Sequence, residues 1–256
     1  MKRLTLFLSV LTVILMFFSC DKENGAEPEN NVVSDPVVVT FQGHSCFQFV
    51  TPELLTVITD PVGNSVPQYY RPPASVIADL VTVSHNHADH TQTGTIQGDP
   101  VILGAADTTL TVGDVEVRGY LTQHGNWNGQ AMGSNIIFVF MIGDIKIVHL
   151  GETGPFSDES IKNAISNADV MIAPTGETAS LSFEEVIALA EETNARTLIP
   201  SHYSLTASNR YYGSSTVEEF VAALPQGTKV VYADTLAVRA GMEEQVVVLT
   251  PLWAKD

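Results

Sequence analysis

Three histidines and one aspartate lie within six positions of this chain, in the stretch VSHNHADH at residues 83–90. The whole chain of 256 residues has only seven histidines, so this stretch holds an unusual share of them. Neutral imidazole is a good ligand for zinc and similar ions, and a carboxylate can hold a second ion or orient a bound water. The spacing therefore favours a metal site over the alternative, a histidine-rich loop on the surface.

The remaining four histidines each stand where an apolar run ends beside small or turn-forming residues. They lie in GHSCF, TQHGN, VHLGETG and PSHY, at His44, His124, His149 and His202. In layered folds, ligands collect where strands end at one edge of a sheet. We therefore expect five separate stretches of the chain to converge on one site.

Short β-rich runs alternate with turn signals through most of the chain. Residues 37–43, 44–50 and 54–60 are predicted to form consecutive strands of a meander. Gly-Asp pairs at 113–114 and 143–144, each between apolar alternations, predict two β-hairpins. Further predicted strands are LVTVSH, VILGA, DVMIAP, RTLIPSH, KVVYAD and QVVVLT.

Helical periodicity is confined to the second half of the chain. Ser182 and Glu185 have the spacing of a capping box and open one predicted helix, and Ser215 and Glu218 open another in the same way. Strands dominate, and the helices are placed between them. This pattern is typical of two packed sheets with helices outside.

The N-terminus is predicted to be an export signal. A basic start, MKR, precedes an uncharged apolar stretch at residues 4–18, and Cys20 follows. This resembles a bacterial lipoprotein signal, with residues 1–19 removed and Cys20 lipidated; an ordinary cleaved signal is the alternative. The acidic residues after Cys20 resemble the export signal of surface lipoproteins in Bacteroidetes-type bacteria, which implies an outer-membrane, surface-exposed protein. Residues 20–36 are then a flexible tether, and 37–256 a folded domain.

The net charge and the cysteine content limit which molecules this chain could bind and which disulfides it could form. The formal net charge is −17, and removal of the signal would take away two basic residues and no acidic one. Such a surface repels phosphate backbones, so nucleic acid is excluded as a partner, whereas a small molecule bound through a metal is not. The chain has two cysteines, and if Cys20 is acylated then Cys46 has no partner and is expected to be a buried, inert thiol.

These residues carry a resemblance to a known family. His-x-His-x-Asp-His at 85–90 is the signature of the metallo-β-lactamase superfamily. The rest of the chain resembles the branch that contains UPF0173-type hydrolases, ascorbate-phosphate lactonases and N-acylphosphatidylethanolamine phospholipase D. The similar segments, in order, are GHSCF at 43–47, TDP at 59–61, TQHG at 122–125, HLGETG at 149–154 and IPSHY at 199–203. The resemblance implies an α/β fold, a four-layer αββα sandwich of the metallo-β-lactamase type, with a two-metal site between the sheet edges.

The resemblance also assigns ligands. His85, His87 and His124 would hold the first metal, and Asp89, His90 and His202 the second. Glu152 stands at the position of the bridging carboxylate, where the family has aspartate. Glutamate is longer by about 1.5 Å, so it could bridge, bind one ion only, or leave the second site weak. One or two divalent ions are therefore expected, with zinc first and manganese or iron as alternatives.

Further residues are predicted to act around the ligands. Asp89 and His149 are the predicted catalytic residues: Asp89 orients the nucleophile, and His149 carries a proton unless it is a satisfied core histidine. Asp60 is expected to accept a hydrogen bond from a ligand histidine. His44 is expected near the pocket. Tyr203 would donate to a developing oxyanion or simply pack. The segment GNWNGQAMG, with Trp127, is predicted to be a loop that borders the pocket.

The implied function is metal-assisted hydrolysis. The metal lowers the pKa of a bound water and presents hydroxide to a small ester, lactone or phosphodiester. A sugar-phosphate substrate would need a basic pocket residue, for which the sequence offers Arg71, Arg118 and Arg210. The alternative is a metal-holding or ligand-binding lipoprotein of the same fold that has lost catalysis.

Overall fold

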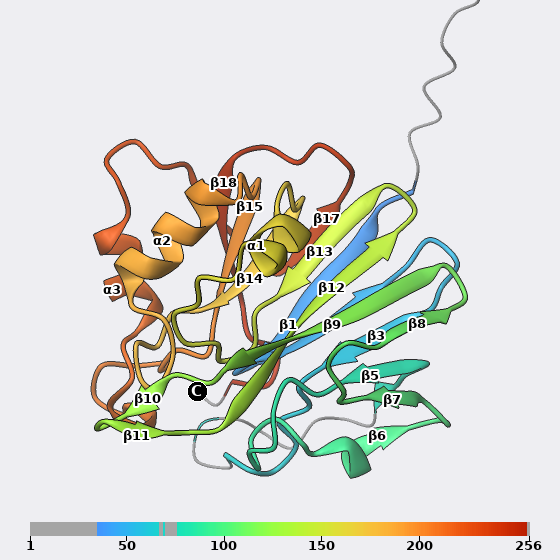
Figure 1. The fold of residues 1–256 in the computed structure, drawn as a ribbon, viewed down its shortest axis with the longest axis horizontal. Coiled ribbons are helices and arrows are strands. Elements are labelled where there is room, and N and C mark those ends of the chain that lie inside the picture. The colour runs from blue at the N-terminus through green and yellow to red at the C-terminus, as the bar shows by residue number, and fades with distance from the viewer. Residues whose placement is uncertain (1–34, 67–68, 70–75, 255–256) are drawn as a thin grey trace, which may run out of the picture. The chain divides into compact units, whose positions relative to one another are not determined.

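Two mixed β-sheets carry the fold of the computed structural model, which describes residues 35–66, 69 and 76–254 (Figure 1). The predicted signal, Cys20 and nearly all of the tether lie outside these residues. The six-stranded sheet has the order β17 (Thr235–Val238), β1 (Val37–Gly43), β2 (Cys46–Val50), β3 (Thr56–Thr59), β5 (Leu80–Thr82) and β7 (Val101–Leu103).

The eight-stranded sheet contains most of the second half of the chain. Its order is β16 (Val230–Ala233), β18 (Gln245–Leu249), β15 (Thr197–Ser201), β14 (Val170–Pro174), β13 (Ile145–His149), β12 (Ser134–Ile142), β9 (Val115–Gln123) and β8 (Thr109–Val112). The two predicted Gly-Asp turns connect β8 to β9 and β12 to β13. Two small sheets pair β4 (Val76–Ile77) with β6 (Ile96–Gln97), and β10 (Asn126–Trp127) with β11 (Gln130–Ala131).

The two large sheets share one hydrophobic core. Phe47 and Phe49 of β2 lie in the same buried cluster as Phe138 and Phe140 of β12, and the rings of Phe49 and Phe140 meet edge to face at 5.3 Å. Successive residues of a strand point to opposite faces, so this alternation directs one face of each sheet to the other. Mixed sheets with few helices confirm the predicted α/β sandwich class.

The six-stranded sheet is buried on its second face as well. A separate buried cluster covers this face. It consists of Cys46, Ile58 and Val81, whose strand neighbours point into the shared core, together with the loop residue Val62 and Trp253. Before β13, the only helical element in the described residues is the short 3-10 turn η1 (Thr93–Thr95). The described residues packed against this cluster include Val76, Ile96 and Tyr211, and none of them lies in an α-helix. Cys46 is fully buried, and burial raises the pKa of its thiol.

Within the described residues, three α-helices lie beside β14, β15 and β18 (Figure 1). They are α1 (Glu159–Ile165), α2 (Phe183–Glu192) and α3 (Val217–Ala223). The predicted capping box of Ser182 and Glu185 opens α2. None of the helices in the described ranges is long and apolar enough to cross a membrane.

The second capping box differs by one residue from the prediction. Thr216 and Glu219 form it, instead of Ser215 and Glu218. The Ser215 hydroxyl donates to the Glu177 carboxylate at 2.9 Å, so it is not available to the helix. The prediction was wrong because a partner distant in sequence takes the serine.

Strand ends from both sheets gather at one edge of the sandwich. β3 and β5 are parallel neighbours, as are β13, β14 and β15. Parallel strands bring their carboxyl ends to the same edge. The residues that follow β3, β5, β13 and β15 are therefore placed close together, and these include the residues singled out in the sequence.

Gly151, just after β13, is expected to be intolerant of a side chain. Its φ is +60°, and a Cβ there would stand 2.4 Å from Asn135 Oδ1 and 2.6 Å from Ser84 Cβ. Gly143 has nearly the same φ, +58°, but nothing within 4 Å of the corresponding Cβ position. Gly143→Ala should lower the free energy of unfolding by about 1 kcal/mol through backbone strain alone, and Gly151→Ala by about 3 kcal/mol through strain and overpacking. Urea denaturation measures both, and equal losses would contradict the close packing at Gly151.

Candidate metal centre

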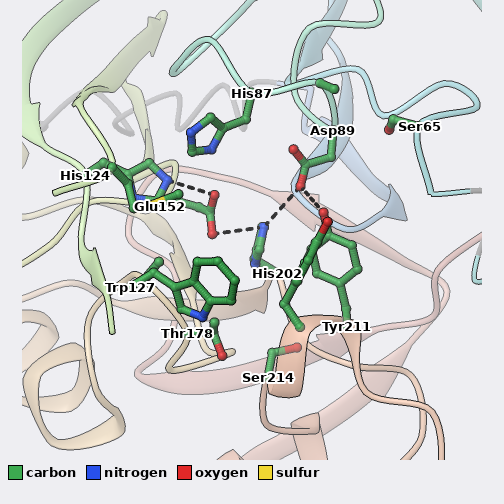
Figure 2. A pocket seen from close by; sticks show the side chains of 14 residues that line it. Ser65, His87, Asp89, His124, Trp127, Glu152, Thr178, His202, Tyr211 and Ser214 are labelled. Carbon is green, nitrogen blue, oxygen red and sulfur yellow. Dashed lines mark hydrogen bonds and ion pairs between the residues drawn. The ribbon is translucent and has the colours of Figure 1, made fainter. Parts of the chain in front are cut away.

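Five segments of the chain bring their polar side chains to one point, and Figure 2 shows His87, Asp89, His124, Glu152 and His202 of this set. They come from the turn between β1 and β2, the segment after β5, and the ends of β9, β13 and β15. These segments carry His44; His85, His87, Asp89 and His90; His124; Glu152; and His202, in that order. The convergence follows from the strand ends described above.

The first group consists of His85, His87, His124 and Glu152, whose candidate ligand atoms lie within 4.8 Å of one another. His85 Nε2 is 2.9 Å from His87 Nδ1, and His124 Nε2 is 3.0 Å from Glu152 Oε2. The isolated bridge between His124 and Thr153 places the end of β9 directly beside Glu152. The three histidines assigned to the first metal are therefore adjacent in space.

The second group consists of His44, Asp89, His90 and His202, with the same 4.8 Å spread. Asp89 Oδ2 lies 2.8 Å from His44 Nε2 and 3.9 Å from His202 Nε2. The sequence assigned Asp89, His90 and His202 to the second metal, and the structure adds His44 to them.

Glu152 lies between the two groups. Its Oε1 is 3.0 Å from His202 Nε2, and its Oε2 is 3.0 Å from His124 Nε2 and 3.4 Å from His90 Nε2. The side chain of Asn135 fixes the backbone here, because its Oδ1 accepts a hydrogen bond from the Glu152 amide at 2.9 Å. The glutamate thus presents Oε1 to the second group, whereas Oε2 contacts the first group and also faces His90 of the second.

Asp60 orients His90 from behind. Its Oδ2 accepts a hydrogen bond from His90 Nδ1 at 2.8 Å, and both of its oxygens accept bonds from Ser84, one from the amide and one from the hydroxyl. This contact leaves His90 Nε2 directed toward Asp89 and Glu152. A carboxylate bonded to the far nitrogen of an imidazole fixes the tautomer that a metal requires.

Three buried carboxylates keep their negative charge in this site. Burial by itself would raise the pKa of Asp60, but the charge and hydrogen bond of His90 outweigh it and lower the pKa to about 2. The pKa of Glu152 is well below its usual range, because the charge of His202 and contacts with His124 and His85 overcome burial. The nearby imidazole of His202 and the hydrogen bond with His44 lower the pKa of Asp89 in the same way, against burial.

The histidines divide into two classes around these carboxylates. Burial dominates for His44 and His85 and lowers the pKa of each to about 4. For His90, the charge of Asp60 outweighs burial and raises the pKa well above its usual value. For His202, the charge of Glu152 outweighs burial and raises the pKa to about 9. Positive charge, carried by protons or by metal ions, is therefore required here.

The arrangement fits divalent metal ions. His90 Nε2 and both ring nitrogens of His202 are buried without a hydrogen-bond partner among the described residues. A buried polar atom without a partner indicates an absent ion or water. Imidazole nitrogens with carboxylate oxygens are the donor set for zinc, and they accept manganese or iron as well. The side chains therefore fit two ions, and their chemistry does not select among these metals.

Two sequence-predicted residues lie away from the pocket. His149 is fully buried at the end of β13, with its ring 6.2 Å from that of Phe47. Tyr203 is 5% exposed and packs in the core, 5.9 Å from the ring of Phe41. Neither lines the cavity, and the catalytic role of His149 and the pocket role of Tyr203 stay predictions.

A different tyrosine faces the site. The Tyr211 hydroxyl donates to Asp89 Oδ2 at 2.7 Å, and its ring packs edge to face on His44 at 4.9 Å. Tyr211 was not among the sequence-predicted residues, and it stands in the turn-forming stretch SNRYYGSS. Two adjacent tyrosines among small polar residues, shortly after His202, were the available signal.

A cavity of about 360 Å³ opens onto both groups (Figure 2). The segment predicted to be a loop bordering the pocket contains the hairpin β10–β11, and its Trp127 and Met132 line the cavity. The full set of lining residues is Ser65, His87, Ala88, Asp89, His124, Trp127, Met132, Glu152, Thr178, Ala179, His202, Tyr211, Tyr212 and Ser214.

The candidate basic residues are engaged elsewhere. The Arg118 guanidinium lies over the ring of Tyr120, 5.0 Å from its centroid. Arg210 forms two hydrogen bonds to the carboxylate of Glu219. Arg71 lies outside the described residues, and among the described residues that line the cavity there is no lysine or arginine.

Comparisons with known proteins agree with this geometry. The family model described as the β-lactamase superfamily domain matches residues 38–202. Proteins called UPF0173 metal-dependent hydrolases are similar to the chain. The one from Methanospirillum hungatei is 27% identical over 230 residues, which span 81% of this chain and 98% of the relative. The one from Carboxydothermus hydrogenoformans is 24% identical over 197 residues, which span 65% and 84%.

Two solved structures are also similar to this chain. A Thermotoga maritima protein, described as a Zn-dependent hydrolase of the metallo-β-lactamase superfamily, is 29% identical with a TM-score of 0.67, covering 83% of this chain and 98% of that one. An isothiocyanate hydrolase from Delia radicum gut bacteria, at 13% identity and a TM-score of 0.56, covers 86% and 98% and shares the fold.

The position of Glu152 predicts the metal content. Protein purified without chelator should hold two ions per chain, and Glu152→Gln should weaken at least one site by about 10-fold or more, because the amide keeps the shape but loses the charge. Elemental analysis after dialysis measures this, with exposed Glu53→Gln as the matched control. A single ion in both wild type and Glu152→Gln would show that Glu152 does not join the two groups.

Proposed function

This chain belongs to the β-lactamase superfamily, and on that premise we propose that it is a metal-dependent hydrolase of small carboxylic esters or lactones. The observation that carries the proposal is the position of Glu152, whose two oxygens face separate histidine groups at the cavity. Its relatives from Carboxydothermus hydrogenoformans and Methanospirillum hungatei are called UPF0173 metal-dependent hydrolases. Phosphodiesters remain the second substrate class.

The metal has a defined place in this proposal. His85, His87, His124 and Glu152 would hold one ion, and Asp89, His90 and His202 the other, with His44 beside it. A bound divalent ion supplies the positive charge that lowers the pKa of water toward neutrality and polarises a carbonyl.

The side chains around the ions orient the reactants. The pKa of Asp89 is well below its usual range, so this carboxylate stays ionised and serves to ligate and orient rather than to take up a proton. His44 and Tyr211 hold its Oδ2 at 2.8 and 2.7 Å. Tyr211 also lines the cavity, and because its single hydroxyl proton is donated to Asp89, it serves to orient that carboxylate.

The cavity wall favours an uncharged substrate. Its described residues include no lysine or arginine, and Ala88, Trp127, Met132 and Ala179 make much of it apolar. A phosphodiester would bring a negative charge into this wall with only the metal ions to balance it. An ester or lactone makes no such demand, which is why we place it first.

Hydrolysis with defined metals tests the proposal. Protein loaded with zinc, manganese or iron should hydrolyse members of a lactone and carboxylic-ester panel faster than bis(4-nitrophenyl) phosphate. EDTA should abolish the activity, and Asp89→Asn should lower kcat by about 100-fold or more, whereas Glu53→Gln should not. Full metal loading without turnover of any substrate would favour the non-catalytic alternative, and faster phosphodiester hydrolysis would reverse the substrate order.

We also propose that the protein is anchored to the outer membrane through lipid on Cys20 and displayed on the cell surface. The support is the basic, apolar and cysteine-terminated start of the sequence. Growth with an alkyne fatty acid should label the wild type and Cys46→Ala, and Cys20→Ser should abolish the label. Labelling of Cys20→Ser, or none in the wild type, would contradict the anchor.

A further inference from the structure

Two aromatic side chains from distant parts of the chain meet at the cavity. Trp127 belongs to the β10–β11 hairpin, and Tyr212 to the 3-10 turn η2 (Tyr211–Gly213). Their ring centroids are 5.8 Å apart with an interplanar angle of 73°, and both residues line the cavity. The two residues are 39% and 68% exposed, although they are large hydrophobic residues beside the candidate metal centre. We call this pair the aromatic corner.

The hairpin fixes the tryptophan relative to the metal ligands. Trp127 pairs with Gln130, and the two residues between them, Asn128 and Gly129, have φ values of +50° and +79°. Positive φ at both central positions is the mark of a two-residue type I′ turn. The base of the hairpin is tied to the centre, because the His124 amide donates to the Gly133 carbonyl at 3.0 Å.

The tyrosine is held in an unusual backbone conformation. Tyr212 has φ +44° and ψ +30°, a left-handed geometry that residues other than glycine rarely adopt. Its neighbours impose it. Arg210 is paired with Glu219 and donates to the Ser214 carbonyl at 3.1 Å, and the Tyr211 hydroxyl is bonded to Asp89. Strained backbone conformations that neighbouring contacts hold in place are found most often at functional sites. Here the strained residue, Tyr212, lines the cavity.

The chemistry of the corner indicates its ligand. Trp127 lines the same cavity as Thr178, Glu152 and His202, as Figure 2 shows. Two rings close to a right angle offer one face and one edge, so a flat ring can stack on one and meet the other edge to face. A saturated ring of the same size would also bury apolar surface here, but it could not make the stacked and edge-to-face contacts.

We propose that Trp127 and Tyr212 form a subsite for a flat aromatic group, so that the substrates are esters or lactones of aryl or arylalkyl carboxylic acids. This inference rests on the proposed function, because it takes the metal centre to be where the carbonyl binds. The product of such a reaction is an aryl-bearing carboxylate, and its binding can be measured without turnover.

Calorimetric titration of zinc-loaded protein with phenylacetate, cyclohexylacetate and acetate tests the subsite. Phenylacetate should bind about 10-fold tighter than acetate and about 3-fold tighter than cyclohexylacetate. Trp127→Ala and Tyr212→Ala should each remove most of this preference and leave acetate affinity unchanged, whereas Trp127→Phe and Tyr212→Phe should retain part of it. Tyr232→Ala is the matched control, because Tyr232 is 66% exposed and lies outside the cavity lining.

The outcomes separate this inference from the proposed function. If acetate binds only when zinc is present but phenylacetate binds no tighter, the subsite is overturned and the metal centre stands. The subsite is also overturned if cyclohexylacetate binds as tightly as phenylacetate, or if Tyr232→Ala loses as much of the phenylacetate preference as Trp127→Ala and Tyr212→Ala. If acetate binding ignores zinc while the phenylacetate preference depends on Trp127 and Tyr212, the subsite stands and the proposed function loses its support.

Discussion

The need to balance three buried carboxylates governs this structure. Asp60, Asp89 and Glu152 lie at the edge of the sandwich where water cannot solvate them fully, and all three have pKa values below their usual range. An ionised carboxylate taken out of water is costly unless positive charge or hydrogen bonds compensate it. Imidazoles from four segments surround these carboxylates, and protons or divalent ions supply the balancing charge, so metal binding at this centre would be coupled to folding.

That requirement is met only because both sheets contribute. His44 lies at the turn between β1 and β2, His202 follows β15, and the His202 amide donates to the His44 carbonyl at 2.8 Å. His44, Asp60 and His202 all have positive φ values, of 61°, 38° and 51°. Three such residues at one centre show that the turns are shaped to aim side chains at the metal ligands rather than to relax the backbone.

The candidate metal ligands and the wall of the cavity come from different parts of the fold. The candidate metal ligands line one part of the cavity, and the β10–β11 hairpin and the η2 turn, which lie outside the two large sheets, contribute Trp127, Tyr211 and Tyr212 to its wall. Loops mounted on a rigid scaffold can vary without disturbing it. A shared fold with the isothiocyanate hydrolase, at 13% identity, therefore says little about the substrate.

The sequence by itself determined the features that a few neighbouring residues encode. The cluster at 85–90, the Gly-Asp hairpins and the capping box at Ser182 are local patterns, and the structure contains each hairpin and that box. Side-chain direction at a strand end is different, because the turn's backbone angles and contacts with the other sheet decide it. Only the tertiary structure could therefore place His149 in the core and Tyr211, in place of Tyr203, against Asp89. It alone decided that Glu152 reaches both histidine groups, since that reach depends on where Asn135 holds its backbone.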